Sequence, residues 1–503
     1  MSTSALVAER TRETAALRVL RRAASFPIML TSLLLLLSVL TVRSRFDDPD
    51  MWWHLKLGEV IWTTHAIPTA DLFSYTTNHH SWIPHEWLSQ LFIYGAYRMG
   101  GYSGLMIWLC LLTSALLIVG YALCWLYSGN AKVAFLGALT IWMFATTGLA
   151  IRPQMVGYLL LVLELLLLHL GRTRSPRWFF GLPLVFAVWV NCHGSFFLGV
   201  AVSGIYLFSS LFHFRAGLLA ASRWDNNRRV ALTLALMLSI AALFLNPVGL
   251  KQIIYPLDTI LHQPIGLGSV DEWQPLRLSD PRGLALLATV GCIFLTLIIR
   301  QSELLWHELL ILALGVWLAV SHQRMLFVFG ILVGPILSRL LSASWEGYDP
   351  KRDRPMPNMM LITASLLIAF WMFPDAQNLT GQVQEQRPAK AVTFIKAHLS
   401  GRMLNDYAYG GYLIWAVPTQ PVFVDGRADV FEATGVLNEF GKWATLESDP
   451  ETLLNKYQID FCLLARQSPM VHVLPLLHNW KLVYSDDLSV IFQRTAPLNE
   501  PRG

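Results

Sequence analysis

The sequence predicts a polytopic α-helical membrane protein with an α/β domain at its C-terminal end. Hydrophobic residues make up 54% of the 503 residues and charged residues only 14%, whereas soluble proteins carry about 25% charged residues. Long apolar runs recur between residues 26 and 373. From residue 374 to residue 503, strand-like and helix-like patterns alternate instead, which is typical of a soluble α/β domain.

The apolar runs have the length of membrane spans. A spanning helix needs roughly 20 apolar residues, and about eleven segments qualify: 26–43, 103–127, 132–150, 154–171, 178–192, 195–213, 230–246, 283–300, 303–320, 323–342 and 357–373. The basic segment 1–25 precedes the first apolar run, as in a signal peptide. No small-residue cleavage site follows the apolar run. We therefore interpret the first run as an uncleaved span rather than a signal peptide.

Basic residues predict the orientation of the chain. Segments on the same side as the N-terminus hold more Lys and Arg than segments on the other side, as expected for cytoplasmic loops. The N-terminus is therefore predicted to be cytoplasmic. An odd number of spans then places residues 374–503 outside the cytoplasmic (inner) membrane of a bacterial-type cell.

The unusual polar clusters all fall on the predicted outer side. Each contains acidic, basic, histidine or tryptophan side chains, whereas the inner connections are short and basic. We expect these clusters to converge on one face below the C-terminal domain, although polar composition by itself is ordinary for loops. They comprise residues 47–50, 151–154, 191–195, 246–251, 271–275 and 321–324.

The first outer loop, residues 44–102, is long and rich in aromatic residues. Helical spacing over 51–62 and an amphipathic stretch over 82–97 predict two interfacial helices. Tryptophans alone would also fit an aromatic belt at the membrane surface. Three aspartates, Asp47, Asp48 and Asp50, precede the first helix. A carboxylate cluster at a lipid–water boundary is hydrated, paired or used in chemistry.

Three short segments resemble one family. D-M-W-W-H-L-K (50–56) resembles the D-x-aromatic-aromatic-[NH]-x-[RK] motif of oligosaccharyltransferase catalytic subunits, and I-P-T-A-D-L-F-S-Y (67–75) resembles their I-P-T-x-D-P segment. Residues 405–429 resemble the W-W-D-Y-G-Y-W segment and the strand that follows it. Together with the topology, these motifs resemble the GT-C fold of membrane glycosyltransferases, which also includes protein mannosyltransferases and aminoarabinose transferases that use one main carboxylate.

The chain departs from the oligosaccharyltransferase pattern in two places. In that family a second acidic motif, in the loop after the third span, binds a divalent metal; here residues 146–155 hold no acid and only Arg152. The two tryptophans of the family's W-W-D-Y-G segment bind the acceptor sequon. In this chain Leu404 and Asn405 stand at their positions, before Asp406 and Tyr407. A divalent metal such as Mg²⁺ or Mn²⁺ is therefore a candidate cofactor rather than a requirement, and asparagine glycosylation is not implied.

The resemblance implies transfer of a sugar from a polyprenyl-phosphate or polyprenyl-diphosphate carrier. Such a reaction needs a carboxylate that takes the acceptor's proton and a cation beside the leaving phosphate. Asp50 is the first candidate for the carboxylate and Asp48 the second. The candidate phosphate ligands are Arg152, Arg324 and Lys251, although the two arginines would also fit a role in reaching lipid headgroups.

Further polar residues on the outer side are candidates for substrate contacts. A metal site built from Asp50, Glu86 and Asp271 or Glu272 has no support from spacing. His193 and His322 stand alone in their loops and also fit a structural role. The complete set of additional candidates is His54, Lys56, His85, Glu86, His193, Asp271, Glu272, His322, Asp406 and Tyr407.

The C-terminal domain is predicted to alternate helices and strands. Gly410–Gly411 is expected to form a tight turn. The segment Asp425-Gly-Arg-Ala-Asp429 is either a strand-end turn with a local ion pair or part of an acceptor site. The expected helices are 388–399, 431–441, 450–457 and 469–478, and the expected strands are 403–404, 422–425, 459–464, 481–484 and 488–493.

The leading functional hypothesis is a glycosyltransferase acting outside the cytoplasmic membrane. Its partners would be a polyprenyl-linked donor, the bilayer and an acceptor glycan, lipid or protein, with no nucleic acid. A second hypothesis is a non-catalytic subunit of a membrane complex on a degenerate GT-C scaffold. A third is a transporter, although we find no internal repeat of the kind that transporters show.

Overall fold

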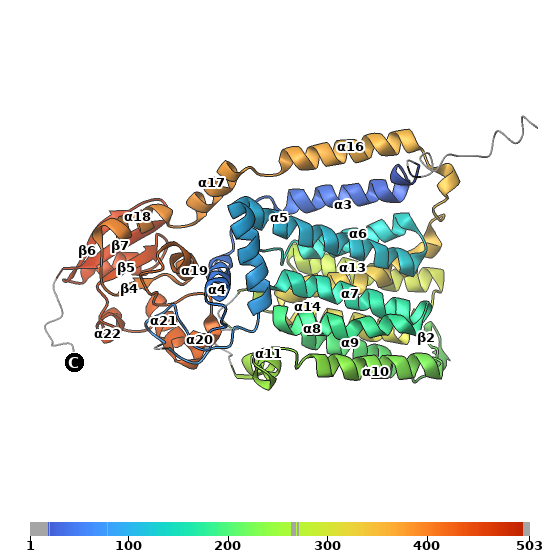
Figure 1. Ribbon diagram of the computed structural model, residues 1–503, viewed down its shortest axis with the longest axis horizontal. Helices are drawn as coiled ribbons and strands as arrows, with labels where there is room; N and C mark the ends of the chain where they lie inside the picture. The colour runs from blue at the N-terminus through green and yellow to red at the C-terminus, as the bar shows by residue number, and fades with distance from the viewer. Residues whose placement is uncertain (1–18, 20, 78, 263–267, 269–270, 496–503) are drawn as a thin grey trace, which may run out of the picture.

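The helices of the predicted membrane region form one bundle, with the C-terminal domain at one end of it (Figure 1). The structure is a computed structural model that describes residues 19, 21–77, 79–262, 268 and 271–495. The bundle helices are α3 (Phe26–Val42), α5 (Trp87–Ser128), α6 (Ala131–Ala145), α7 (Gln154–Thr173), α8 (Leu182–Cys192), α9 (Phe196–Ser209), α10 (Asn226–Ala242), α13 (Pro281–Arg300), α14 (Trp306–Ser321), α15 (Leu326–Leu341) and α16 (Pro355–Met372).

Each segment that the sequence predicts to span a membrane holds a helix, but the helices differ in length. Five stretches of the described chain are long and apolar enough to cross a membrane: Trp87–Ser128, Gln154–Thr173, Pro281–Arg300, Gln323–Ser344 and Pro355–Met372. Shorter apolar helices are α3, α6, α9 and α14. The count of about eleven spans therefore remains a prediction.

Helix α15 lies at the centre of the bundle. Nearly all of its side chains are buried, and it packs against α5, α6 and α14. Small residues allow the close approach to α6, because a Cβ atom added at Gly137 would lie 2.0 Å from Ser338 Oγ. Small residues at helix contacts are typical of membrane bundles.

The first outer loop contains a helix in each of the two segments predicted to be interfacial, with one boundary changed, and their position at a membrane surface remains a prediction. Helix α4 (Met51–Thr64) confirms the first. The second starts at Trp87 rather than residue 82, because the Trp82 N–H is bound to Thr69 O in an extended segment. It ends where the long α5 breaks at Gly100 and Gly101; Gly101 has φ 56°, which favours glycine. Figure 1 shows α4 and the start of α5 between the bundle and the C-terminal domain.

The C-terminal domain is built on a four-stranded mixed sheet with the order β4-β5-β7-β6. Strand β4 pairs with β5 in parallel, and the other two pairings are antiparallel. The predicted α/β alternation is confirmed by β4 (Met403–Asn405), β5 (Phe461–Ala465), β6 (Trp480–Ser485), β7 (Ser489–Arg494), α17 (Ala376–Gln386), α18 (Ala389–His398), α19 (Tyr407–Ala416), α20 (Ala428–Ala433), α21 (Val436–Ala444), α22 (Pro450–Lys456) and α23 (Met470–Val473).

The strand predicted at 422–425 is not part of this sheet. Val422 forms a single bridge with Ser74 of the first outer loop. The side chain of Asn405 takes the place of a neighbouring strand: its Oδ1 accepts from Phe423 N–H at 2.8 Å, and its Nδ2 donates to Val424 O at 2.7 Å. This segment therefore joins the C-terminal domain to the first outer loop.

The turn predicted at Gly410–Gly411 is also wrong, because both glycines lie inside helix α19. A Cβ atom at Gly410 would lie 2.1 Å from Val424 O, and one at Gly411 would lie 2.5 Å from Pro49 O. The glycines are needed for close packing against these backbone oxygens and not for a turn.

Arg427 holds the C-terminal domain on the first outer loop. Its guanidinium donates to both oxygens of Asp425 and to Asp71 Oδ1, and all three side chains are completely buried. The cation also lies 5.0 Å from the ring centroids of Phe73 and of Trp82. The predicted local Asp–Arg pair is thus present, and Asp71 of the first outer loop completes it.

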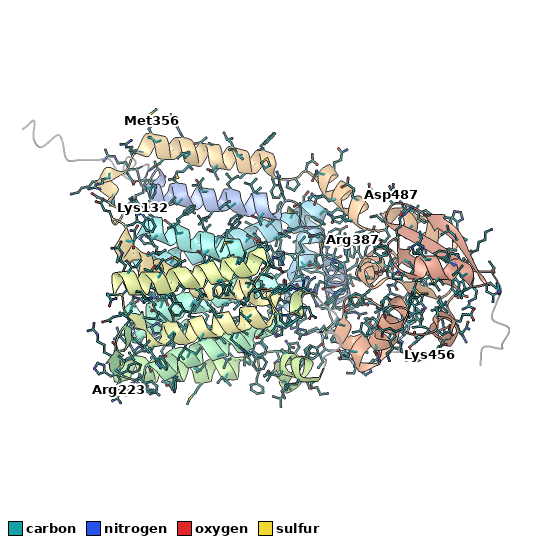
Figure 2. All side chains as sticks on the ribbon, turned by 180° about the vertical axis from the view of Figure 1, so that it is seen from behind. Lys132, Arg223, Met356, Arg387, Lys456 and Asp487 are labelled. Atoms are coloured by element: carbon teal, nitrogen blue, oxygen red, sulfur yellow. The ribbon has the colours of Figure 1, made fainter. Side chains whose placement is uncertain are left out.

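Figure 2 shows Lys132, Arg223 and Met356 at the end of the bundle away from the C-terminal domain, and Arg387 at the junction between the two parts. Arg387 donates to the backbone oxygen of Phe46, so a second arginine joins the C-terminal domain to the first outer loop. Lys132 and Arg223 belong to segments that the sequence places in the cytoplasm, and both lie at the end of the bundle opposite this domain. The orientation in the membrane remains a prediction.

We expect Arg427→Met to lower the free energy of unfolding by about 3–5 kcal/mol, because two buried carboxylates lose their cation. Chemical unfolding in detergent, followed by tryptophan fluorescence, measures this loss. Arg352→Met is the control, since the Arg352–Glu346 pair is exposed and exposed pairs contribute little. Equal effects of the two substitutions would contradict the role of Arg427.

Candidate functional site

A cavity of about 420 Å³ lies where the bundle, the first outer loop and the C-terminal domain meet. Five of the six predicted outer clusters contribute to its wall: 47–50, 151–154, 191–195, 271–275 and 321–324. The sixth, 246–251, does not. The helix that follows it, α11 (Leu250–His262), contributes Tyr255, Pro256 and Thr259. The C-terminal domain contributes Tyr407 and residues 426–429.

Arg152 is the centre of an ionic network at one end of the cavity. Its guanidinium binds Asp48 through two nitrogens, with 2.8 Å between Nη2 and Asp48 Oδ1. The same Nη2 lies 3.1 Å from Asp50 Oδ2, and Nη1 lies 2.9 Å from Glu272 Oε1. The three carboxylates come from two separate loops, so the predicted cluster around Asp50 is paired.

Arg324 extends this network into the cavity. Its Nη1 lies 3.3 Å from Glu272 Oε1, and its Nη2 donates to Gln154 Oε1. The guanidinium lies 5.3 Å from the ring centroid of Trp273. His322 positions this tryptophan, because His322 Nδ1 lies 2.7 Å from Trp273 O, which fits the structural role considered for His322.

Asp50 is the aspartate of the first loop that faces the cavity. Its backbone N–H donates to Asp48 Oδ1 at 2.8 Å. Gly426 of the C-terminal domain covers its carboxylate: a Cβ atom at Gly426 would lie 1.8 Å from Asp50 Oδ1. Burial raises the pKa of Asp50 to about 6, while the charge of Arg152 opposes the rise. Such a group changes protonation state close to neutral pH.

Glu86 and three histidines form another part of the cavity wall. Glu86 oxygens lie 3.5 Å from His193 Nε2, 3.7 Å from His85 Nε2 and 3.9 Å from His54 Nδ1. Burial raises the pKa of Glu86, and burial lowers the pKa of His54 and of His193 well below the usual value. His54 and His193 are therefore neutral at physiological pH, and Glu86 has no arginine or lysine bound to it among the described contacts.

The C-terminal domain supplies a fourth carboxylate to the wall of the cavity, beside Asp50, Glu86 and Glu272. Asp429 accepts hydrogen bonds from Trp82 Nε1 at 3.1 Å and from the Tyr255 hydroxyl. The ring of His85 packs against that of Tyr255 at a tilt of 36°, with 4.6 Å between the ring centroids. Residues 425–429 thus combine the predicted ion pair with a contribution to the cavity wall, and a role in acceptor binding remains a prediction.

Five of the predicted site residues are described but do not line the cavity: Asp48, His322, Lys251, Lys56 and Asp406. Lys251 is exposed on α11. Lys56 forms an ion pair with Glu59 on α4 at 2.5 Å. Asp406 is the N-cap of α19 and accepts from Ala408 N–H at 3.1 Å. Asp271 begins the short 3₁₀ helix η3 (Asp271–Trp273), and its side chain lies outside the described residues.

The sequence did not single out Gln154, Tyr255, Trp273 or Gly426. A signal for Tyr255 exists in the spacing of Leu250, Ile254, Leu257 and Leu261, which are exposed on one side of α11 and leave Tyr255 on the other. Gly426 has no such signal, because its role depends on contact with a loop almost four hundred residues away.

We expect the carboxyl group of Asp50 to titrate near pH 6, and Arg152→Gln to move this titration to higher pH, because the guanidinium stabilises the carboxylate. Infrared difference spectra of the carboxyl stretch measure the midpoint, and Asp50→Asn identifies the band. A midpoint near pH 4, or a shift to lower pH in Arg152→Gln, would contradict this description of the site.

The sequence matches no protein-family model and no curated protein sequence. Solved structures do resemble the fold. The archaeal oligosaccharyltransferase AglB from Archaeoglobus fulgidus in complex with an inhibitory peptide and a dolichol-phosphate is 12% identical, with a TM-score of 0.56 over 88% of this chain and 69% of that chain. The apo form of the Archaeoglobus fulgidus oligosaccharyltransferase is 13% identical, with a TM-score of 0.57 over 94% of this chain and 75% of that chain.

ArnT from Cupriavidus metallidurans bound to undecaprenyl phosphate is 13% identical, with a TM-score of 0.54 over 94% of this chain and 99% of that chain. These proteins are membrane glycosyltransferases of the GT-C superfamily. The resemblance seen in the sequence is therefore confirmed at the level of structure: this chain has the GT-C fold.

Proposed function

We propose that the protein is a glycosyltransferase that moves a sugar from a polyprenyl-phosphate or polyprenyl-diphosphate carrier to an acceptor on the outer side of the cytoplasmic membrane. The observation that carries the proposal is the cavity itself. It places a carboxylate with a pKa of about 6, Asp50, and a cation, Arg324, in one wall at the end of an apolar bundle. Structures of the same fold contain dolichol-phosphate and undecaprenyl phosphate.

In this proposal Asp50 is the general base. The acceptor's O–H or N–H bond breaks and its proton passes to the Asp50 carboxylate, while the acceptor atom bonds to the anomeric carbon. The bond between that carbon and the phosphate oxygen breaks, and the oxygen keeps the electron pair. A base with a pKa near the working pH is well suited to this step. Asp48 is an orienting group, because Arg152 and the Asp50 N–H occupy its oxygens.

Arg324 is our choice for the leaving phosphate. It faces the cavity, and a charge-assisted hydrogen bond to phosphate would stabilise the developing negative charge. Arg152 already forms ion pairs with Asp48, Asp50 and Glu272. It is therefore less available to bind a phosphate than the sequence suggested. Lys251 lies outside the cavity wall, so it is not proposed as a phosphate ligand.

Sugar hydroxyls are assigned to the part of the cavity wall around Glu86. Glu86 and Asp429 provide carboxylate oxygens, His85 and His193 provide ring nitrogens, and Tyr255 provides an aromatic face. Carboxylates accept hydrogen bonds from hydroxyls, and neutral imidazoles both donate and accept. The acceptor would reach Asp50 beside Tyr407 and Gly426, where the C-terminal domain covers the cavity.

We expect Asp50→Asn to slow release of undecaprenyl phosphate from radiolabelled undecaprenyl-phosphate hexoses by about 10²–10⁴-fold, the usual contribution of a general base. Reconstituted vesicles containing inner-membrane extract as the acceptor source provide the assay. The wild-type rate should fall as the pH drops below about 6, because Asp50 becomes protonated.

Asp47→Asn is the matched control, because Asp47 belongs to the same loop but its side chain is 59% exposed. This variant should retain the wild-type rate. Wild-type transfer by Asp50→Asn would remove Asp50 from the reaction. No transfer by the wild type with any hexose, together with co-purification of other membrane proteins, would favour a non-catalytic subunit instead.

A further inference from the structure

We infer that the guanidinium of Arg152 takes the place of a divalent metal ion, so that the carboxylates of Asp48, Asp50 and Glu272 work without a metal. This inference rests on the proposed function and deepens it. Oligosaccharyltransferase catalytic subunits, which the sequence resembles, have an acidic metal-binding motif in the loop where this chain has Arg152. The structure shows what this replacement does to the other acids of the site.

Arg152 gathers carboxylates as a divalent cation would. Asp48 and Asp50 belong to the first outer loop, whereas Glu272 lies in η3, more than two hundred residues further along the chain. Each has an oxygen at the guanidinium, with separations of 2.8 Å for Asp48 Oδ1, 3.1 Å for Asp50 Oδ2 and 2.9 Å for Glu272 Oε1. Carboxylate oxygens from separate segments are also what Mg²⁺ and related ions bind.

The charges of the site support the same inference. Arg324 shares Glu272 Oε1 with Arg152. Two guanidinium groups therefore face the three carboxylates, and they carry the same total charge as one divalent ion. A metal bound at these oxygens would add two positive charges next to two arginines and would break the Arg152 hydrogen bonds. The two arginines therefore already balance two of the three carboxylate charges of the site.

Other metal sites are not apparent in the described part of the chain. No group of three or more His, Cys, Asp or Glu side chains there is arranged to hold a metal ion. The oxygens of Glu86 lie 3.5–3.9 Å from the nearest imidazole nitrogens, and His193 Nδ1 is already 2.7 Å from Ser195 Oγ. Within the candidate set of Asp50, Glu86 and Glu272, Arg152 thus binds Asp50 and Glu272, whereas Glu86 lies beside imidazoles.

The test uses Mn²⁺ as the probe and begins with the unmodified full-length protein. We expect electron paramagnetic resonance to detect no stoichiometric Mn²⁺ binding, and undecaprenyl phosphate release to be unchanged by EDTA. Stoichiometric Mn²⁺ binding by the wild type, or loss of transfer in EDTA with recovery in Mn²⁺, would overturn the inference while leaving the proposed function intact. These arms need no variant, so they do not depend on whether a variant folds.

Arg152→Asp is the decisive variant, because it removes the cation and restores an acid in that loop. We expect it to bind one Mn²⁺ per chain, to lose transfer in EDTA by about 10²–10³-fold and to regain activity with Mn²⁺. Arg45→Asp is the matched control: it makes the same change of charge beside Asp47, outside the cavity wall, and should bind no Mn²⁺.

A second variant ties Mn²⁺ binding to these carboxylates. Adding Asp48→Asn to Arg152→Asp should weaken Mn²⁺ binding at least tenfold, whereas unchanged binding would place the ion elsewhere and overturn the inference. If Arg152→Asp binds Mn²⁺ as described but no form of the protein transfers a sugar, the cation replacement holds and the proposed function fails.

Discussion

The buried ion pair of Arg427 with Asp71 and Asp425 is the interaction on which the rest of the site depends. It lies between the C-terminal domain and the first outer loop, with no side-chain exposure. Removing a charged group from water is costly, and the cost is offset only when every partner is in place. The pair therefore fixes how the two parts meet, and with them Gly426 over Asp50 and Asp429 in the cavity wall.

A second ionic network, around Arg152, positions the acidic side chains of the cavity below this junction. A guanidinium is always charged and directs several donors in fixed directions, so it can hold Asp48, Asp50 and Glu272 in one arrangement. This arrangement keeps Asp50 partly exposed to the cavity while burial raises its pKa. Among the described residues, the ion-pair partners of Glu86 are imidazoles. The region around Arg152 and Arg324 therefore holds guanidinium groups, as expected if it receives a phosphate, whereas the region around Glu86 holds a carboxylate and imidazoles that suit a sugar.

The elements that were predicted well are those specified by local pattern. Helix α4 follows from the spacing of residues 51–62, and the strands β5, β6 and β7 follow from runs of apolar residues in the tail. The failures lie where a distant contact overrides the local pattern. Gly410–Gly411 has the composition of a turn, but the need to approach Pro49 and Val424 places both glycines in a helix.

The sequence alone determined that the chain has apolar helices, that its unusual polar residues lie in the loops of one face, and that its tail is an α/β domain. Only the tertiary structure decided which of Asp47, Asp48 and Asp50 faces the cavity, that Lys251 and Lys56 lie outside it, and that Arg152 binds carboxylates. The reason is physical. Helices and strands follow from periodicity within a segment, whereas an ion pair is made by side chains that come together from loops far apart in the chain.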